Sequence, residues 1–198
     1  NGDIWRGGED GILYIYDAAT KKTVRLSPEL CNNRAILQLA EDKDGNIWLG
    51  TQGGQLIKWN RSDKQFRLQQ PFKNSISRLY VDSQNNIWAC TLLDGVFLIK
   101  SDDGSILAHY TGKGPANKKL LINGAADVIQ FDDTTMIIAS NGINILNTKT
   151  GSFTYLDEGS EISSLVKDKN GLLWFSTSAG IVSRNLTKKN IIVSFDAK

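Results

Sequence analysis

Five polar side chains of this chain have the donor and acceptor groups that hold a hydroxyl-rich ligand such as a carbohydrate. Guanidinium, carboxamide and carboxylate groups are planar, and each can form two hydrogen bonds to neighbouring polar atoms. The five residues are Arg34, Gln52, Asp94, Asn123 and Asn141, and all lie between apolar runs. An aromatic ring usually completes a carbohydrate site, and Phe72 is the nearest one in such a segment. Ordinary surface loops therefore remain the alternative interpretation.

Residues for catalysis or metal binding are scarce. The single histidine, His109, lies in an apolar run that we predict to be an outer strand. The turn with Asp42, Asp44 and Asn46 resembles the start of a calcium loop. Such a loop needs a glutamate at its twelfth position, which is Gly53 in this chain, so a plain hairpin turn is favoured. We predict no catalytic residue, no metal and no cofactor, and hence that this segment is not an enzyme.

Composition excludes several classes of partner. The 198 residues contain 23 Lys and Arg against 21 Asp and Glu, a net charge of +2. This balance argues against a nucleic-acid partner or an anionic membrane surface, because both select for strongly basic faces. No apolar run reaches the length of about 18 residues that a membrane-spanning helix needs. The informative feature is instead an internal repeat.

The repeat has a period of about 42 residues and organises the whole chain. Its first landmark is an Ile-Trp or Leu-Trp pair after a turn rich in Asp, Asn and Gly. Its second is a glycine that opens the next apolar run. The tryptophans are Trp5, Trp48, Trp88 and Trp174, and the glycines are Gly11, Gly54, Gly95, Gly142 and Gly180. Ile137 replaces tryptophan in a degenerate fourth copy. We interpret these residues as structural, with the tryptophans packing between neighbouring repeats.

Each period is long enough for four short strands, named A to D. In the second copy the predicted strands cover residues 36–40, 47–51, 55–59 and 65–69. Four antiparallel strands in a repeat of this length are typical of a β-propeller blade. The predicted fold is therefore an all-β propeller built of four-stranded antiparallel blades, in a single domain over residues 1–198. The repeats span approximately 1–33, 34–75, 76–124, 125–161 and 162–198.

The predicted ring geometry places the candidate residues on one face. About five repeats are present, and we favour an arc of a seven-bladed ring over a closed five-bladed ring. Strand A of each blade lines the central axis, so the D–A and B–C loops share one face. The A–B turns on the other face are nearly uniform in sequence and are interpreted as structural. The five candidate polar residues all fall on the variable D–A and B–C face, where functional groups concentrate.

The segment Glu41 to Thr51, EDKDGNIWLGT, resembles the two-component regulator propeller repeat. Residues 2–17, 82–95 and 168–180 resemble it again, so the resemblance covers essentially the whole chain. The copies depart from the pattern at Ile137 and at Cys90, where the pattern prefers glycine.

This resemblance implies a periplasmic, extracytoplasmic sensor segment within an inner-membrane hybrid two-component histidine kinase and response regulator. The implied ligand is an oligosaccharide, and the implied output is the regulation of polysaccharide-utilisation genes. Further blades and downstream domains of the parent chain are implied partners, together with a second copy in a homodimer.

Two other functions stay open. Related propellers act as non-catalytic scaffolds for protein–protein interaction, for example in secretion. Residues 173–177 also resemble propeller lyases, whose histidine base would have to be His109. A propeller glycosidase of the sialidase type would need an arginine cluster, whereas the arginines of this chain are scattered along the sequence.

Overall fold

The computed structural model describes residues 2–186 and 192–196, which form five antiparallel sheets and two short 3-10 helices. Part of the fifth predicted repeat, residues 187–191 and 197–198, lies outside the described residues. Each sheet is a meander in which strands adjacent in sequence pair with each other.

The first sheet contains β1 (Ile4–Gly7), β2 (Leu13–Asp17) and β3 (Lys22–Leu26), and the second contains β4 (Ile36–Glu41), β5 (Ile47–Thr51), β6 (Gln55–Trp59) and β7 (Phe66–Pro71). The third contains β8 (Ile76–Val81), β9 (Ile87–Thr91), β10 (Val96–Ile99) and β11 (Ile106–Tyr110). The fourth contains β12 (Asp127–Asp132), β13 (Thr135–Asn147) and β14 (Ser152–Glu161), and the fifth contains β15 (Leu165–Lys167), β16 (Leu173–Thr177), β17 (Gly180–Arg184) and β18 (Ile192–Asp196). The helices are η1 (Glu9–Gly11) and η2 (Glu29–Cys31).

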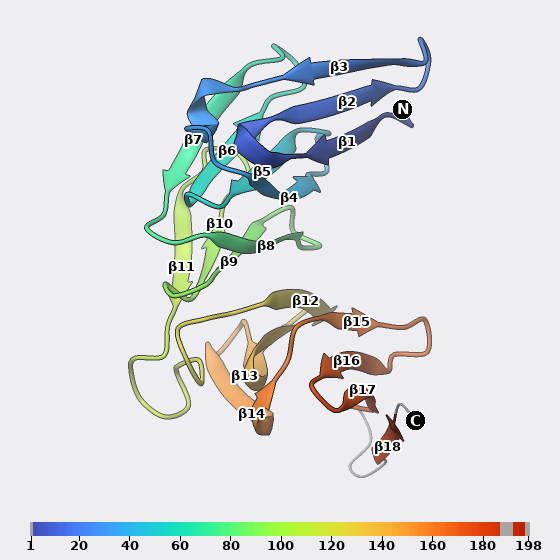
Figure 1. Ribbon diagram of the computed structural model, residues 1–198. Helices are drawn as coiled ribbons and strands as arrows, with labels where there is room; N and C mark the ends of the chain where they lie inside the picture. Colours follow the sequence, from blue (N-terminus) through green and yellow to red (C-terminus); the bar gives the residue numbers. More distant parts are fainter. Residues whose placement is uncertain (1, 187–191, 197–198) are drawn as a thin grey trace.

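The five sheets are arranged as an arc, with the first and fifth sheets at its two ends (Figure 1). The innermost strands contact one another in chain order, from β1 to β4, β8, β12 and β15. The predicted strands of the second repeat agree with β4 to β7 to within two residues at each end. This agreement follows from the turn residues, which fix the strand ends locally.

The fourth sheet contains its strands B and C within one element, β13. The first half of β13 pairs with β12 and the second half pairs with β14. The element turns back at Gly142, where φ is 114°. Its two ends meet where the backbone N–H of Thr148 donates to the carbonyl of Thr134 at 2.8 Å. The sheet therefore keeps the four-strand path of a blade, although Ile137 replaces the tryptophan of the other copies.

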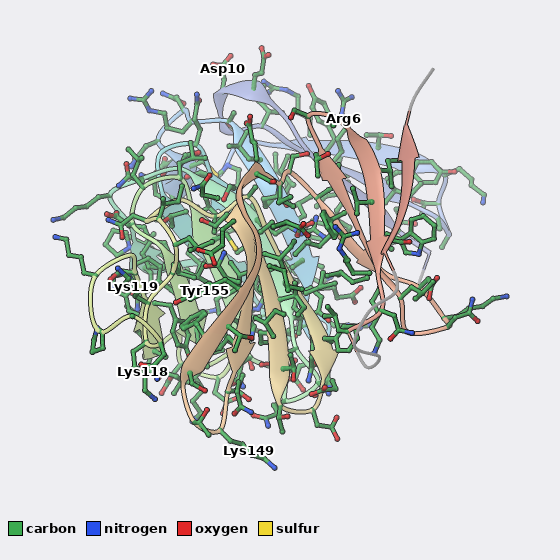
Figure 2. All side chains as sticks on the ribbon, turned by 90° about the horizontal axis from the view of Figure 1, so that it is seen from below. Arg6, Asp10, Lys118, Lys119, Lys149 and Tyr155 are labelled. Carbon is green, nitrogen blue, oxygen red and sulfur yellow. The ribbon has the colours of Figure 1, made fainter. Side chains whose placement is uncertain are left out.

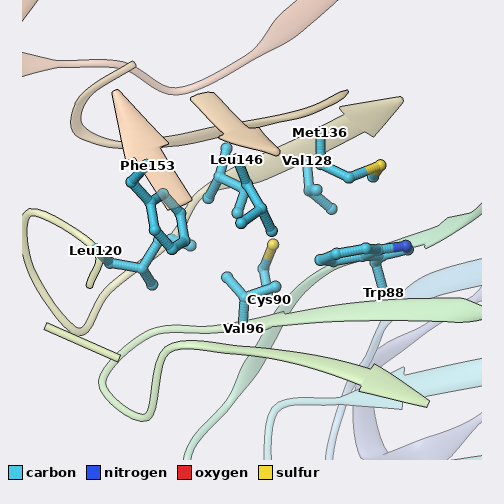
Figure 3. Packing of buried hydrophobic residues seen from close by; sticks show 10 residues of the cluster. Trp88, Cys90, Val96, Leu120, Val128, Met136, Leu146 and Phe153 are labelled. Carbon is cyan, nitrogen blue, oxygen red and sulfur yellow. The ribbon is translucent and has the colours of Figure 1, made fainter. Parts of the chain in front are cut away.

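The core lies between neighbouring sheets, because each sheet has apolar side chains on both faces. Every residue of β5 and β9, the B strands of the second and third sheets, is buried. Figure 3 shows the layer between the third and fourth sheets, where the indole of Trp88 and the thiol of Cys90 face Val128 and Leu146. Trp48 occupies the corresponding position between the second and third sheets. Both tryptophans are fully buried.

An aspartate six residues before the tryptophan holds the ring in three of the blades. The indole Nε1 of Trp48 donates to Asp42 Oδ2, that of Trp88 to Asp82 Oδ2 and that of Trp174 to Asp168 Oδ2, each at 2.9 Å. The other carboxylate oxygen of Asp42 accepts the backbone N–H groups of the A–B turn. The repeated aspartate therefore links the turn to the tryptophan, a role beyond the turn-forming one that its sequence position indicates.

Two further properties concern the cysteines and membrane-spanning helices. Cys31 and Cys90 are both buried free thiols. Within residues 2–186 and 192–196, no helix has the length and apolar character to cross a membrane.

Candidate functional site

The D–A and B–C loops lie together along one face of the arc. The backbone N–H of Gln52, in a B–C loop, donates to the carbonyl of Ala35 in the preceding D–A loop at 2.8 Å. The same kind of bond links Leu92 to Ser75 at 3.1 Å. Because these bonds recur from blade to blade, the side chains of the two kinds of loop are presented side by side.

On this face lies an open depression of about 560 Å³, which we call the Arg34 depression. It is lined by Asn32, Arg34, Gln52, Gly53, Gln55 and Lys73. The lining comes from three segments: the loop that follows η2, the B–C turn between β5 and β6, and the loop that follows β7. Two of the predicted residues, Arg34 and Gln52, are therefore brought together at one site.

The loop that carries Arg34 is anchored by a buried cysteine. Asn32 and Asn33 both have positive φ, 51° and 53°, so the chain reverses directly after η2. Cys31 is buried beneath this reversal, and its carbonyl accepts the N–H of Arg34 at 2.9 Å. The pKa of the Cys31 thiol is raised to about 11 by burial, so the thiol stays protonated at neutral pH. Arg34 itself is left exposed at the rim.

Gly54 places Lys73 beside the B–C turn. Its φ is 86°, and an added Cβ would lie 2.3 Å from the carbonyl oxygen of Phe72. The backbone N–H of Phe72 donates to the carbonyl of Gly54 at 2.9 Å. Only glycine permits this close approach at positive φ. The contact fixes the position of Lys73, the next residue along the chain.

Gln55 is oriented by its own strand. The hydroxyl of Thr51 donates to Gln55 Oε1 at 2.6 Å, and the N–H of Gln55 donates to Thr51 Oγ1 at 2.9 Å. The acceptor end of the carboxamide is thereby engaged, and the NH₂ end is the group left to meet a ligand.

Three predicted residues lie away from the depression. Asn123 is half-buried, and its Oδ1 accepts the N–H of Gly112 at 2.6 Å, so its side chain closes a loop of its own blade. Asp94 lies in the turn between β9 and β10, where its backbone carbonyl is 2.6 Å from His109 Nε2. Asn141 is exposed and pairs with Glu161 across the sheet.

Three lining residues, Asn32, Gln55 and Lys73, are absent from the predicted set. Asn32 and Lys73 lie in the two D–A loops that flank the B–C turn at Gln52. Pairing each B–C turn with the D–A loop on either side would have found them in the sequence. Gln55 carries no such signal, because it is the first residue of β6 and its exposure depends on the tertiary structure.

The aromatic ring expected to complete the site is used elsewhere. Phe72 is half-buried and stacks on Phe97, with ring centroids 4.2 Å apart. His109 stacks on Phe97 at 3.9 Å, with the two rings nearly parallel. The three rings form a column between blades, and none of them lines the Arg34 depression.

The longest D–A loop, residues 111–126, is fastened to the outer strand of the fourth sheet. The hydroxyl of Tyr155 on β14 donates to the carbonyls of Ala116 and Lys119, at 2.6 and 2.7 Å. Figure 2 shows Lys118, Lys119 and Tyr155 on this side of the molecule, with Arg6 and Asp10 well apart from them. This loop is therefore a separate feature from the Arg34 depression.

Comparison with solved structures defines the class of fold. The computationally designed Ika8 protein superposes with a TM-score of 0.75 at 16% identity, over 94% of this chain and 56% of that one. The extracellular domain of the putative hybrid two component system BT4673 from B. thetaiotaomicron gives a TM-score of 0.75 at 20% identity. That match covers 98% of this chain and 30% of that one. With the sheet topology, these likenesses confirm the predicted all-β propeller fold of four-stranded antiparallel blades.

Comparison of sequences identifies the repeat. The model of the two component regulator propeller family matches residues 29–53 and 157–179. Histidine kinase P4 of Formosa agariphila is 24% identical over 217 residues, covering 96% of this chain. The chain spans only 15% of the length of that relative. The predicted resemblance is confirmed: residues 29–53 and 157–179 match the two-component regulator propeller repeat.

Proposed function

We propose that this chain is the ligand-sensing propeller segment of a hybrid two-component signalling protein and that it binds an oligosaccharide in the Arg34 depression. The observation that carries the proposal is the depression itself, a polar site of about 560 Å³ on the loop face of a regulator propeller. Its lining offers guanidinium, carboxamide and ammonium groups, which suit the closely spaced oxygens of a sugar.

The rest of the proposal concerns the parent protein. The segment lies outside the cytoplasm, in the periplasm, as part of an inner-membrane protein. Its partners are further blades, downstream domains and a second copy of the chain, and its output is control of polysaccharide-utilisation genes. The segment itself is non-catalytic and transmits binding to a kinase. For this to happen the sugar must bind one signalling state more tightly than the other.

A thermal-shift screen against a panel of oligosaccharides, followed by calorimetry on the 198-residue chain, tests the binding step. A ligand that binds only the folded state stabilises it by RT ln(1 + L/Kd), where L is the free ligand concentration, and therefore raises the unfolding temperature as that concentration increases. We expect at least one shift, with affinity reduced about tenfold by Gln52→Ala. Asn141→Ala is the control, because Asn141 is exposed but does not line the depression. Absence of binding across the panel would refute the proposal.

A protein-interaction scaffold is the second candidate function, and one observation favours it. Leu92, Leu93 and Ile122 are exposed on the same loop face, at 54%, 66% and 47% of their accessible surface. An added Cβ on Gly124 would contact both Leu92 O and Ile122 Cδ1, so two of these residues are neighbours. A photo-crosslinking residue at Leu93 would label a protein other than a second copy if the scaffold function is correct. The sensor function predicts no such product.

A further inference from the structure

The lining of the Arg34 depression is rich in hydrogen-bond donors and carries positive charge. Arg34 and Lys73 contribute two cations, and none of the described residues that line the depression is an aspartate or a glutamate. The acidic residues of the neighbouring B–C loops, Glu9, Asp10 and Asp94, are not part of it. Among the described residues, neither Arg34 nor Lys73 forms an ion pair with a carboxylate. The two charges are therefore available to a ligand.

The uncharged lining residues add donors. Gln55 Oε1 already accepts the Thr51 hydroxyl at 2.6 Å, so its NH₂ group is the part available to a ligand. Gly53 provides the space for Arg34, because a Cβ on Gly53 would lie 2.8 Å from Arg34 Cγ. The aliphatic part of the Arg34 side chain therefore lies next to the backbone of Gly53.

A neutral sugar would find hydrogen-bonding groups in this depression but no aromatic ring among its described lining residues. Neutral sugars gain much of their affinity by stacking an apolar ring face on an aromatic side chain, and the part of the chain that the structure describes provides no such ring to the lining. Phe72, the closest ring in sequence, already stacks on Phe97. Affinity must therefore come from charge-assisted hydrogen bonds, which are roughly twice as strong as neutral ones.

We propose that the ligand of the Arg34 depression is an acidic oligosaccharide, bound through a carboxylate or sulfate group. The inference rests on the proposed function and names the class of sugar that the site takes. The guanidinium of Arg34 holds the anionic group with two parallel hydrogen bonds, and Lys73 supplies a second positive charge. Gln52 and Gln55 bind the hydroxyls of the adjoining sugar unit and thereby set the position of the oligosaccharide in the depression.

The test is calorimetric titration of the 198-residue chain with matched sugars. Each acidic oligosaccharide, a uronic acid oligomer or a sulfated oligomer, is paired with its neutral counterpart of the same length and linkage. We expect binding of an acidic member at least about tenfold tighter than that of its neutral counterpart. Affinity should also fall as salt rises from 50 to 300 mM, because exposed charges are screened. Preference for uronate or for sulfate identifies which anion the site takes.

The variants are Arg34→Gln and Lys73→Gln, each expected to weaken acidic ligands about tenfold while leaving neutral ones unchanged. Lys149→Gln is the matched control, because Lys149 is an exposed lysine outside the depression. Thermal unfolding of each variant checks that the fold is intact.

The outcomes separate the two proposals. One outcome would overturn the acidic ligand and leave the sensor function standing. In that outcome neutral sugars bind tightly, Gln52→Ala weakens their binding, and Arg34→Gln and Lys73→Gln do not affect it. Failure of every sugar to bind would overturn both.

Discussion

Replacing Asp42 by alanine tests the carboxylate that joins the A–B turn to the buried tryptophan. The side chain of Asp42 is fully buried and accepts hydrogen bonds from Trp48 Nε1 at 2.9 Å and from the Asn46 backbone N–H at 2.9 Å. Lys58 Nζ lies 3.9 Å from the same carboxylate but also donates to Ser101 O at 2.6 Å. Lys58 therefore keeps a partner after the change.

The expected cost follows from the three buried donors that lose their acceptor, which are Trp48 Nε1, the Asn46 backbone N–H and Asn46 Nδ2. Each unsatisfied donor costs about 1–3 kcal/mol, so we expect Asp42→Ala to lower the free energy of unfolding by about 3–9 kcal/mol. That is a large share of the roughly 5–15 kcal/mol stability of a typical domain. The measurement is urea unfolding followed by tryptophan fluorescence and circular dichroism, with the slope of the transition compared between variants.

A double-mutant cycle with Trp48→Phe isolates the indole hydrogen bond. Phenylalanine has no side-chain N–H that needs an acceptor. Trp48→Phe should therefore cost about 1–3 kcal/mol less in the Asp42→Ala background than in the wild-type chain. Asp44→Ala is the control in the same turn, because Asp44 is exposed and, within the described part of the chain, its side chain accepts a hydrogen bond only from Asn85 Nδ2. We expect it to change stability by no more than about 0.5 kcal/mol. A change of that size for Asp42→Ala, or a coupling energy near zero, would refute the reasoning.

Two further predictions concern the backbone and a buried carboxyl. Gly95→Ala should destabilise the chain by more than about 2 kcal/mol, since its φ is 83° and the new Cβ would lie 2.0 Å from Tyr110 O. Gly171→Ala, at φ 80° with open space around it, should cost only the backbone strain of about 1 kcal/mol. Equal losses of unfolding free energy for the two variants, measured by urea unfolding, would contradict this account. For Asp127, burial raises the carboxyl pKa, against opposing hydrogen bonds from Leu165 N and Val128 N and the charge of Arg78. The folded state therefore holds this proton more tightly than the unfolded state, so the wild-type chain should lose stability relative to Asp127→Asn as pH rises above about 3.8. Parallel stability curves for the two proteins between pH 4 and 7 would exclude this effect.

Much of the fold could be predicted from the sequence because blade structure is local. Turn residues such as Gly45, with φ of 78°, fix where each hairpin reverses. The apolar runs between turns fix the strands, and their repetition predicts that sheets pack on one another. Ile137 does not disrupt the fourth sheet, because a buried B strand needs apolar volume at that position and not specifically an indole.

Other features were visible in the sequence but had no evident meaning there. In the sequence, an aspartate six residues before each of three tryptophans shows only a constant spacing. Only the folded hairpin brings Asp42 Oδ2 within 2.9 Å of Trp48 Nε1. Asn123 is a similar case, because a polar residue in a loop can equally face a ligand or its own backbone. Its Oδ1 accepts the N–H of Gly112, eleven residues away.

The sequence by itself determined the repeat, the strands and the face on which the variable loops lie. The tertiary structure decided which of those loops form a site, bringing Arg34 and Gln52 together with Lys73 and leaving Asp94, Asn123 and Asn141 elsewhere. The physical reason is the separation along the chain of the residues that interact. Strands and turns are set by neighbours a few residues apart, whereas the Arg34 depression depends on how one blade packs against the next. That packing is set by contacts between blades such as Gly50 on β5 against Ile76 on β8, where an added Cβ would lie 2.7 Å from Ile76 Cγ2, and no local pattern in the chain reveals them.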